Sequence, residues 1–283
     1  MSMVLGSCRP NQLDVDAGGS AMRTTVSVAT SVAAALAAAA CGVMPPAVFS
    51  QRGTAAPGDG SCPTTAAAAF GWGAPNRADD FTDSSLAGWG IYDGPGHNGN
   101  GRRTPSAMSV ADGVLTITGD AEGNSGGMAW YPGQLHGRWE VCAKAPPSAA
   151  GYQVVLLLWP DAGDWPAGGE VDFMEALDPA RQNIDFFLHY GPDNSQDHGG
   201  INIDATQWHS WAVEWTSEHI AAYVDGRQWW ETTNTAHLPP RPMHLGIQLD
   251  NSGGDTSLSG QLMVDWARQY GTSAIQPNSR RTK

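Results

Sequence analysis

The stretch "GGEVDFMEAL" (residues 168–177) places three carboxylates within six residues of otherwise apolar and aromatic chain. Its composition is typical of a buried β-strand. Side chains alternate between the two faces of a strand, so Glu170 and Asp172 share a face whereas Glu175 should point to the other. Because an isolated buried charge is very costly, the acids must face water, a metal or a substrate cleft. One extra residue between Asp172 and Glu175, held in a β-bulge, would return Glu175 to the face of the other two.

The bulge, at Phe173 or Met174, also predicts a curved sheet. With the extra residue counted out, Glu170 and Glu175 lie four strand steps apart, roughly 13 Å between α-carbons. Retaining glycosidases hold their two carboxyl groups about 5–5.5 Å apart. The two side chains converge that far only if the strand curves with the acids on its concave side. We therefore expect a curved sheet that lines a cleft.

The chain from Asp79 onward reads as an all-β domain. Short runs rich in Val, Ile, Trp and Tyr are separated by Gly, Pro, Asn and Asp, and Asp225-Gly226 between two of them is a hairpin signal. No segment after the leader has convincing helical periodicity. These features predict a β-sandwich or barrel in one domain, residues 76–271, followed by a polar tail, 272–283. The expected strands are residues 112–119, 136–144, 151–159, 183–191, 208–216, 219–226 and 261–270.

The charge of the chain limits its partners. The formal net charge is −13 and the sequence pI is about 4.8. Nucleic-acid binding relies on Lys and Arg to neutralise phosphates, so nucleic acid is not an expected partner. The same charge disfavours a strongly anionic polysaccharide as a substrate. High Gly, Pro and Trp with few Lys and Arg are typical of a loop-rich extracellular β-protein.

The N-terminal part has the features of an export signal. "MRTTVSVATSVAAALAAAACGV" (residues 22–43) has one positive charge, a run of small apolar residues and a small-residue ending. We expect a signal peptide at 22–41 that starts at Met22, with residues 1–21 a mis-annotated extension and 42–75 an Ala/Pro/Gly-rich linker. The context of Cys41 resembles a lipoprotein signal, which leaves lipid attachment and simple cleavage as alternatives. A transmembrane anchor is disfavoured because the apolar run is short for a bilayer. The mature protein is therefore expected to be secreted or attached to the cell envelope.

Export of the protein affects which cysteines remain in the mature chain and whether they form a disulfide. If Cys8 lies outside the true chain and Cys41 is removed or lipidated, Cys62 and Cys142 remain. An oxidising compartment favours a disulfide between them, which would attach the linker to a strand. Two unrelated thiols are the alternative, because the sequence does not give their separation.

The acidic motif also carries a resemblance. Glu-x-Asp-x-x-Glu, preceded by "LLLWP" (156–160) and "WPAGG" (165–169), resembles glycoside hydrolase family 16, in its bulged, laminarinase-like bacterial branch. Four further segments occur in the same order as in the family, so the resemblance covers roughly residues 79–271. They are "DDFTDSSLAGW" (79–89), "WHSWAVEWT" (208–216), "YVDG" (223–226) and "MVDWARQY" (263–270). The resemblance implies a jelly-roll sandwich of two curved antiparallel sheets with a concave substrate cleft.

The resemblance implies a role for each acid. Glu170 would be the nucleophile and Glu175 the acid/base of a double displacement, with Asp172 assisting between them. Close like charges raise one of the pKa values, as a general acid requires. A calcium site is the alternative for the three acids, but the strand spacing lacks the backbone-carbonyl loop that such sites use. No cofactor is required for this chemistry.

Further positions match the family's cleft. His189 falls near the acid/base, although it could instead be a hydrogen-bonded strand residue. Trp165 and Trp159 offer flat faces and indole N–H groups to sugar rings, or pack in the core. Gln248 stands where relatives often have a polar cleft residue. Asp80 and Asp265 occur where some relatives bind a structural Ca²⁺ and are otherwise surface acids.

Two departures from the family matter. Cys142 in "EVCAK" (140–144) stands where relatives more often have a charged residue, which supports the disulfide. The Gly/Asn-rich loop at residues 92–107 is unlike the better-known laminarinases, which leaves the linkage preference open because loops set specificity.

Three functions are therefore weighed. The first is an exported, monomeric endo-glycosidase that hydrolyses internal β-1,3 bonds of a neutral β-glucan with retention. The second applies the same mechanism to a mixed-linkage glucan or a galactan-type wall polysaccharide, or to transglycosylation. The third is a non-catalytic, lectin-like carbohydrate-binding protein, which the presence of all three acids disfavours.

Overall fold

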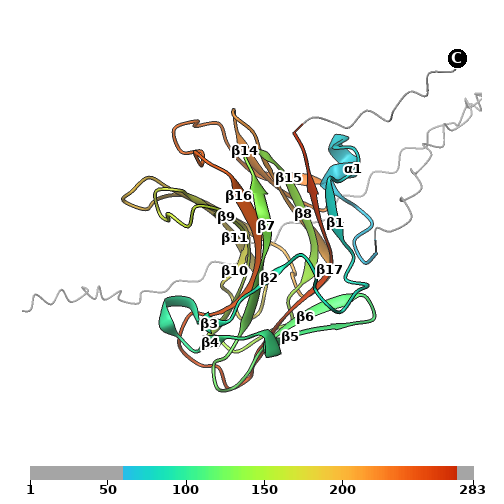
Figure 1. Ribbon diagram of the computed structural model, residues 1–283, viewed down its shortest axis with the longest axis vertical. Coiled ribbons are helices and arrows are strands. Elements are labelled where there is room, and N and C mark those ends of the chain that lie inside the picture. Colours follow the sequence, from blue (N-terminus) through green and yellow to red (C-terminus); the bar gives the residue numbers. More distant parts are fainter. Residues whose placement is uncertain (1–59, 273–283) are drawn as a thin grey trace, which may run out of the picture. The chain divides into compact units, whose positions relative to one another are not determined.

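The computed structural model describes residues 60–272 (Figure 1). These residues form one short α-helix, two 3₁₀ turns and seventeen strands. In chain order the elements are α1 (Ala66–Phe70), β1 (Arg77–Asp79), β2 (Gly90–Ile91), β3 (Gly94–Pro95), η1 (His97–Gly99), β4 (Arg102–Arg103), η2 (Pro105–Ala107), β5 (Met108–Ala111), β6 (Val114–Gly119), β7 (Gly126–Gln134), β8 (Gly137–Lys144), β9 (Tyr152–Pro160), β10 (Glu170–Ala176), β11 (Asn183–Tyr190), β12 (Ser195–Asn202), β13 (His209–Trp215), β14 (Ile220–Val224), β15 (Arg227–Thr232), β16 (Met243–Asn251) and β17 (Gly260–Tyr270).

Two large antiparallel sheets make up the fold. The front sheet has the strand order β12-β11-β10-β9-β16-β7-β2. The back sheet has the order β15-β14-β13-β8-β17-β6-β5, with β1 added beside β17. Strands β3 and β4 form a small separate hairpin. The all-β sandwich of two antiparallel sheets predicted from the sequence is thus confirmed.

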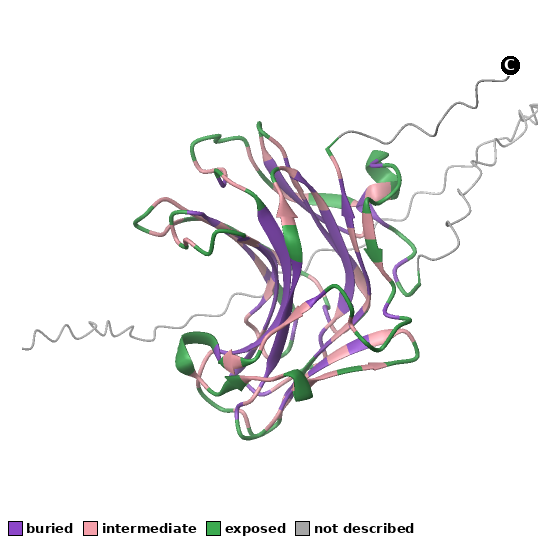
Figure 2. Cartoon of the chain, viewed as in Figure 1, coloured by how far each residue is buried: buried purple, intermediate pink, exposed green. Residues whose placement is uncertain are grey.

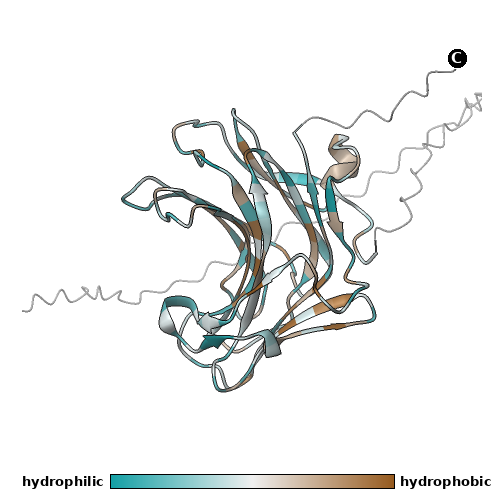
Figure 3. Cartoon of the chain, in the orientation of Figure 1, coloured by the Kyte–Doolittle hydropathy of each residue, from teal (hydrophilic) through white to brown (hydrophobic). Residues whose placement is uncertain are grey.

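The hydrophobic core lies between the two sheets. Figure 2 shows buried residues along the strands of both sheets, and Figure 3 shows hydrophobic residues on the same strands. The largest fully buried side chains include Trp139, Trp215 and Phe173, which belong to one continuous cluster. Burial of such aromatic side chains contributes about 1.5–3 kcal/mol each. The core therefore fixes one face of each strand and leaves the other face of the front sheet for the cleft.

The strand predictions hold at every segment. The seven expected segments correspond to β6, β8, β9, β11, β13, β14 and β17. Asp225 and Gly226 both have positive φ, 48° and 71°, and join β14 to β15 as expected for an Asp-Gly hairpin. Strands β7, β12 and β16 were not among the expected strands. Gly-rich and polar sequences such as "SQDHGGIN" (195–202) weaken the strand signal in β7 and β12.

The described part of the expected linker is docked on the domain. Cys62 and Cys142 form a disulfide with 5.8 Å between their α-carbons, which confirms the predicted bridge. Helix α1 follows, and its N-terminal amide at Ala66 donates to the buried carboxylate of Glu140 at 2.5 Å. Trp72 is buried just after the helix. Residues 60–75 therefore differ from a free linker, since a disulfide, a helix cap and an aromatic side chain attach them to the back sheet.

Some sequence predictions fall outside the described residues. These are the extension at 1–21, the signal at 22–41, the lipid site at Cys41 and nearly all of the tail at 272–283. Within residues 60–272 no helix is long and apolar enough to cross a membrane.

Candidate active site

The acidic strand contains the expected bulge. Against β9, Asp172 pairs with Leu157 and Met174 pairs with the next residue, Leu156, so Phe173 is the extra residue. The pairing with β11 shifts over the same interval. Phe173 and Met174 are both fully buried in the core. The bulge therefore places two successive side chains in the core and returns Glu175 to the other face.

Glu170, Asp172 and Glu175 all line a single cleft of about 800 Å³ on the front sheet. In the β11 register they lie opposite His189, Phe187 and Asp185 respectively. The rest of the cleft comes from β9, β16 and β7 and from the segment that runs from β2 through β4. Side chains from these elements that line the cleft include Gln153, Trp159, His244, Gln248, Asp250, Tyr131, Tyr92, His97, Asn98 and Arg103.

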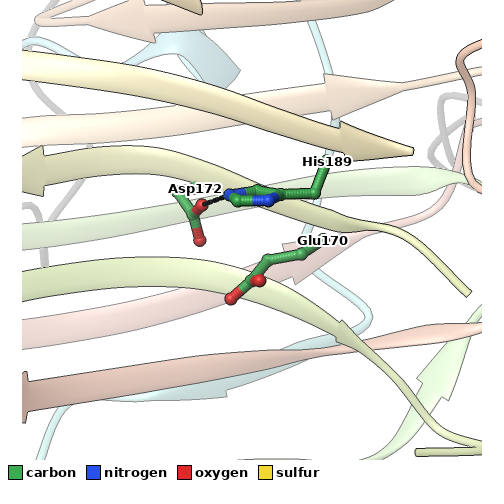
Figure 4. A group of neighbouring side chains, drawn as sticks. All are labelled: Glu170, Asp172 and His189. Carbon is green, nitrogen blue, oxygen red and sulfur yellow. Dashed lines mark ion pairs between the residues drawn. The ribbon is translucent and has the colours of Figure 1, made fainter. Parts of the chain in front are cut away.

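The centre of the cleft is a compact polar cluster. Glu170, Asp172 and His189 each offer an oxygen or nitrogen atom within 4.8 Å of the others (Figure 4). His189 Nε2 lies 3.3 Å from Asp172 Oδ2, and His189 Nδ1 lies 2.8 Å from Asn194 Oδ1. Asp172 is buried, and its Oδ1 has no hydrogen-bond partner among the described residues. The cluster thus brings the imidazole of His189, on β11, against the carboxyl groups of the neighbouring strand β10.

Burial and mutual repulsion raise the pKa values of all three acids. The pKa of Glu175 rises to about 7, first because of burial and then because of the Glu170 charge. Burial raises the pKa of Glu170, as does the Asp172 charge, whereas a hydrogen bond from the Trp165 side chain lowers it. The pKa of Asp172 is raised by burial and by Glu175. Such a cluster keeps at least one carboxyl protonated near neutral pH, as general-acid chemistry needs.

The four side chains expected to bind substrate all reach this cleft. Trp159 and Trp165 stack with ring centroids 6.2 Å apart and planes within 10° of parallel. Trp165 is 41% exposed, which leaves ring surface for a ligand. His189 belongs to the acidic cluster, and Gln248 is a buried cleft residue on β16.

The expected calcium ligands lie elsewhere. Asp80 has Arg268 at 3.9 Å, and Asp265 accepts a hydrogen bond from the Ser61 amide at 2.5 Å. Within residues 60–272, the cluster of Glu170, Asp172 and His189 is the sole group with three closely spaced potential metal ligands. Calcium binding by Asp80 and Asp265 stays a prediction.

Sequence reasoning missed an ion pair in the cleft. Arg103 donates to Asp250 Oδ1 from Nε at 3.0 Å and from Nη2 at 2.6 Å, and Nη2 also donates to Gln248 Oε1 at 2.7 Å. Arg103 comes from the unusual loop at 92–107, more than 140 residues from Asp250. An arginine in a Gly/Asn-rich loop carries no local signal of its distant partner.

Comparison with known proteins identifies relatives of the domain. The sequence model described as "Glycosyl hydrolases family 16" matches residues 98–268. The chain is 27% identical over 164 residues to glucan endo-1,3-beta-glucosidase A1 of Niallia circulans, covering 48% of the chain and 24% of that protein. It is 30% identical over 145 residues to the beta-1,3-glucan-binding protein of Penaeus monodon, covering 40% of the chain and 38% of that protein. The chain thus spans well under half the length of these two curated relatives.

The fold has solved counterparts. The laminarinase from Rhodothermus marinus superposes with a TM-score of 0.62 at 24% identity, over 70% of this chain and 96% of that one. This likeness extends over nearly all of that chain, and it agrees with the two-sheet architecture described above.

Proposed function

The chain belongs to glycosyl hydrolase family 16, and on that premise we propose that it is an exported retaining endo-glycosidase. Its proposed substrate is a neutral β-glucan, cleaved at internal β-1,3-glucosidic bonds. The observation that carries this proposal is the bulged strand β10, which places Glu170, Asp172 and Glu175 together in one cleft. An acidic trio of this kind suits double displacement at an anomeric carbon.

The proposed reaction has two steps. The Glu170 carboxylate attacks the anomeric carbon, and the bond from that carbon to the leaving oxygen breaks while Glu175 donates its proton to that oxygen. A water molecule then attacks the same carbon, Glu175 accepts the water's proton, and the bond to Glu170 breaks. The sugar leaves with its original anomeric configuration, and both carboxyl groups return to their starting states.

The protonation state that this reaction requires of Glu175 suits the site. Glu175 must be protonated at the start, and its pKa of about 7 means that the acid form is lost as pH rises through 7. Activity should therefore fall on the alkaline side near neutral pH. Glu170 must be ionised, so activity should also fall at low pH as this group takes up a proton. Asp172 is placed to bind both Glu170 and His189 and to hold them in position.

The walls of the cleft favour a neutral sugar chain. Several carboxylates line it, so a polyanionic glycan would be repelled. Trp165 and Trp159 provide stacked aromatic surface beside Glu170, and such faces bind the apolar faces of pyranose rings. A mixed-linkage glucan or a galactan-type wall polymer, and transfer to a sugar instead of water, are variants of the same proposal.

Replacement of the nucleophile tests the proposal. We expect Glu170→Gln to lower reducing-sugar release from laminarin, a β-1,3-glucan, by at least about 10³-fold. Binding of laminarin oligosaccharides, measured by calorimetry, should persist because the amide keeps the shape of the side chain. Glu218→Gln, an equivalent change at an exposed turn, is the matched control and should behave as wild type. Hydrolysis by Glu170→Gln at the wild-type rate would refute the nucleophile assignment.

A second candidate is a non-catalytic glucan-binding protein. The similarity to the Penaeus monodon protein named for glucan binding favours it. A polysaccharide panel with product analysis separates the two functions, because a binding protein would retain the glycans without shortening them. The same panel identifies the linkage that is cleaved.

Export is part of the proposal. The disulfide between Cys62 and Cys142 supports an oxidising compartment. Signal cleavage that removes Cys41, or lipid attachment at Cys41, would place the domain outside the cytoplasm or on the cell envelope. Mass spectrometry of the mature N-terminus distinguishes these two outcomes.

A further inference from the structure

Within residues 60–272, one permanently charged cation lines the cleft. Four carboxylates, those of Glu170, Asp172, Glu175 and Asp250, line it. Among the described lining residues, Arg103 is the sole lysine or arginine. Its guanidinium does not pair with the catalytic trio but with Asp250, through two hydrogen bonds. The side chain of Asp250 is 7% exposed, so solvent screens its charge poorly.

Backbone hydrogen bonds on both sides of Arg103 hold this residue at the cleft. The Ser125 amide donates to the Arg102 carbonyl at 2.8 Å, and the Thr104 amide donates to the Ser125 carbonyl at 2.9 Å, so the chain on both sides of Arg103 is fixed beside β7. Gly127 of β7 leaves room for the ring of Tyr92, because a Cβ there would lie 2.7 Å from it. The Arg103 guanidinium lies over that ring, 5.4 Å from its centroid.

The sheet register places Asp250 within electrostatic reach of Glu175. Val155 of β9 pairs with Glu175 on one side and with Gln248 on the other, so Gln248 and Glu175 are in one row, two strands apart. Two strand spacings are roughly 10 Å. Asp250 lies two residues beyond Gln248 on the same face of β16.

On these grounds we propose that Arg103 is a positioning residue of the active site, which neutralises Asp250 and thereby sets the pH range in which Glu175 acts as the general acid. The proposal rests on the function proposed above. Removal of Arg103 would leave the Asp250 charge uncompensated in a cleft that already holds the acidic trio.

Other charged or titratable groups lie near Asp250 and near Glu175. Asp250 is also approached by His97, whose Nδ1 is 3.8 Å from Asp250 Oδ2, and by the Tyr92 hydroxyl. Glu175 interacts electrostatically with Glu170 and Asp172 on its own strand and with His189 and Asp185 on β11. Asp185 in turn pairs with His198 at 2.7 Å. The Asp250 charge raises the pKa of Glu175 and that of Asp172, which supports coupling across the cleft.

A double-mutant cycle of pH profiles tests the proposal. Arg103→Gln leaves Asp250 uncompensated, so the alkaline limb of kcat/KM should move to higher pH by about half a unit, as expected for one charge at roughly 12 Å in a partly screened site. Asp250→Asn leaves Arg103 uncompensated and should move the limb to lower pH. The double variant should return close to wild type, and Arg103→Lys, which keeps the charge, should stay close to it. Arg102→Gln, an exposed neighbour that pairs with Asp93 outside the cleft, is the matched control.

The outcomes separate this role from a structural one. The proposal is overturned if the alkaline limb of kcat/KM stays in place in both variants. It is also overturned if the limb moves in the same direction in Arg103→Gln and Asp250→Asn, even if kcat falls. If Arg103→Gln does not fold, Asp250→Asn and Arg103→Lys still carry the test through the direction of the limb.

A second readout does not need activity. The titration of the Glu175 carboxyl carbon, followed by ¹³C NMR and assigned with Glu175→Gln, should shift in the same directions. Shifts of this signal in a protein that cleaves no glycan would support the role of Arg103 and refute the proposed hydrolase. If the Glu175 signal does not move in the variants while the protein cleaves glucan, the role of Arg103 is refuted and the proposed hydrolase is supported.

Discussion

The Trp165 side chain acts on one of the two glutamates that the proposed reaction uses. Burial raises the pKa of both Glu170 and Glu175, and each is also raised by a neighbouring carboxylate. His189 lowers both. The hydrogen bond from the Trp165 side chain acts on Glu170 alone. The indole N–H of Trp165 therefore favours the ionised form of Glu170, the proposed nucleophile, and opposes part of the rise in its pKa.

Replacing Trp165 by Phe should separate this polar role from ring stacking. The N–H stabilises ionised Glu170, so its loss raises the pKa of Glu170, and the acid limb of kcat/KM should move to higher pH. Activity below the limb falls because protonated Glu170 cannot attack. Trp159→Phe, which changes the stacked partner but not that hydrogen bond, should alter KM and leave the acid limb in place. Identical acid limbs for wild type and Trp165→Phe in the measured pH profile would contradict this role.

Strand β10 shows how far sequence reasoning extends at the level of an element. Alternation of side chains, with the high cost of burying acids, predicted both the strand and its bulge, because both are local properties of six residues. The pairing to β9 then identified Phe173 as the extra residue, a choice between Phe173 and Met174 that the sequence left open. The Arg103–Asp250 pair could not be predicted in this way, since it depends on which distant loop lies beside β7.

Deletion of Phe173 tests the bulge as an element. Without this residue the alternation from Asp172 through Met174 to Glu175 is regular, so Glu175 should still face the cleft. The lost aromatic side chain should lower the free energy of unfolding by about 3–5 kcal/mol, measured by urea denaturation. Hydrolysis of laminarin should remain above that of Glu170→Gln.

A two-residue deletion provides the contrast. Removal of both Phe173 and Met174 reverses the parity, directs Glu175 toward the core and should abolish both hydrolysis and stable folding. A folded Phe173 deletion with no more activity than Glu170→Gln would show that the bulge itself, beyond its effect on parity, is required.

The docked N-terminal segment matters at the scale of the whole domain. The sequence predicted the Cys62–Cys142 bridge but described residues 60–75 as a linker, because Ala, Pro and Gly give no packing signal. In the structure Glu140 accepts hydrogen bonds from the α1 amide at Ala66 and, at 2.6 Å, from the Ser210 hydroxyl, and Cys62, Cys142 and Trp266 form a small buried cluster. These contacts lie on the back sheet, whereas the cleft is formed on the front sheet. The contacts that attach the N-terminal segment and the proposed active site therefore lie on opposite faces of the sandwich.

Removal of the disulfide should accordingly lower stability without changing the chemistry. The bridge closes a loop with a sequence separation of 80 residues, and loss of such a link costs about 2–4 kcal/mol, or roughly 5–15 °C in Tm for a domain of this size. Thermal unfolding followed by near-UV circular dichroism should show this fall for the wild type in dithiothreitol and for Cys62→Ala/Cys142→Ala. The Tm of the double variant should not change when dithiothreitol is added, which controls for effects of the reductant other than reduction of this disulfide. Hydrolysis of laminarin well below Tm should match wild type in both cases, because neither cysteine lines the cleft. A Tm that is insensitive to complete reduction would show that Glu140 and Trp72 alone hold the segment on the back sheet.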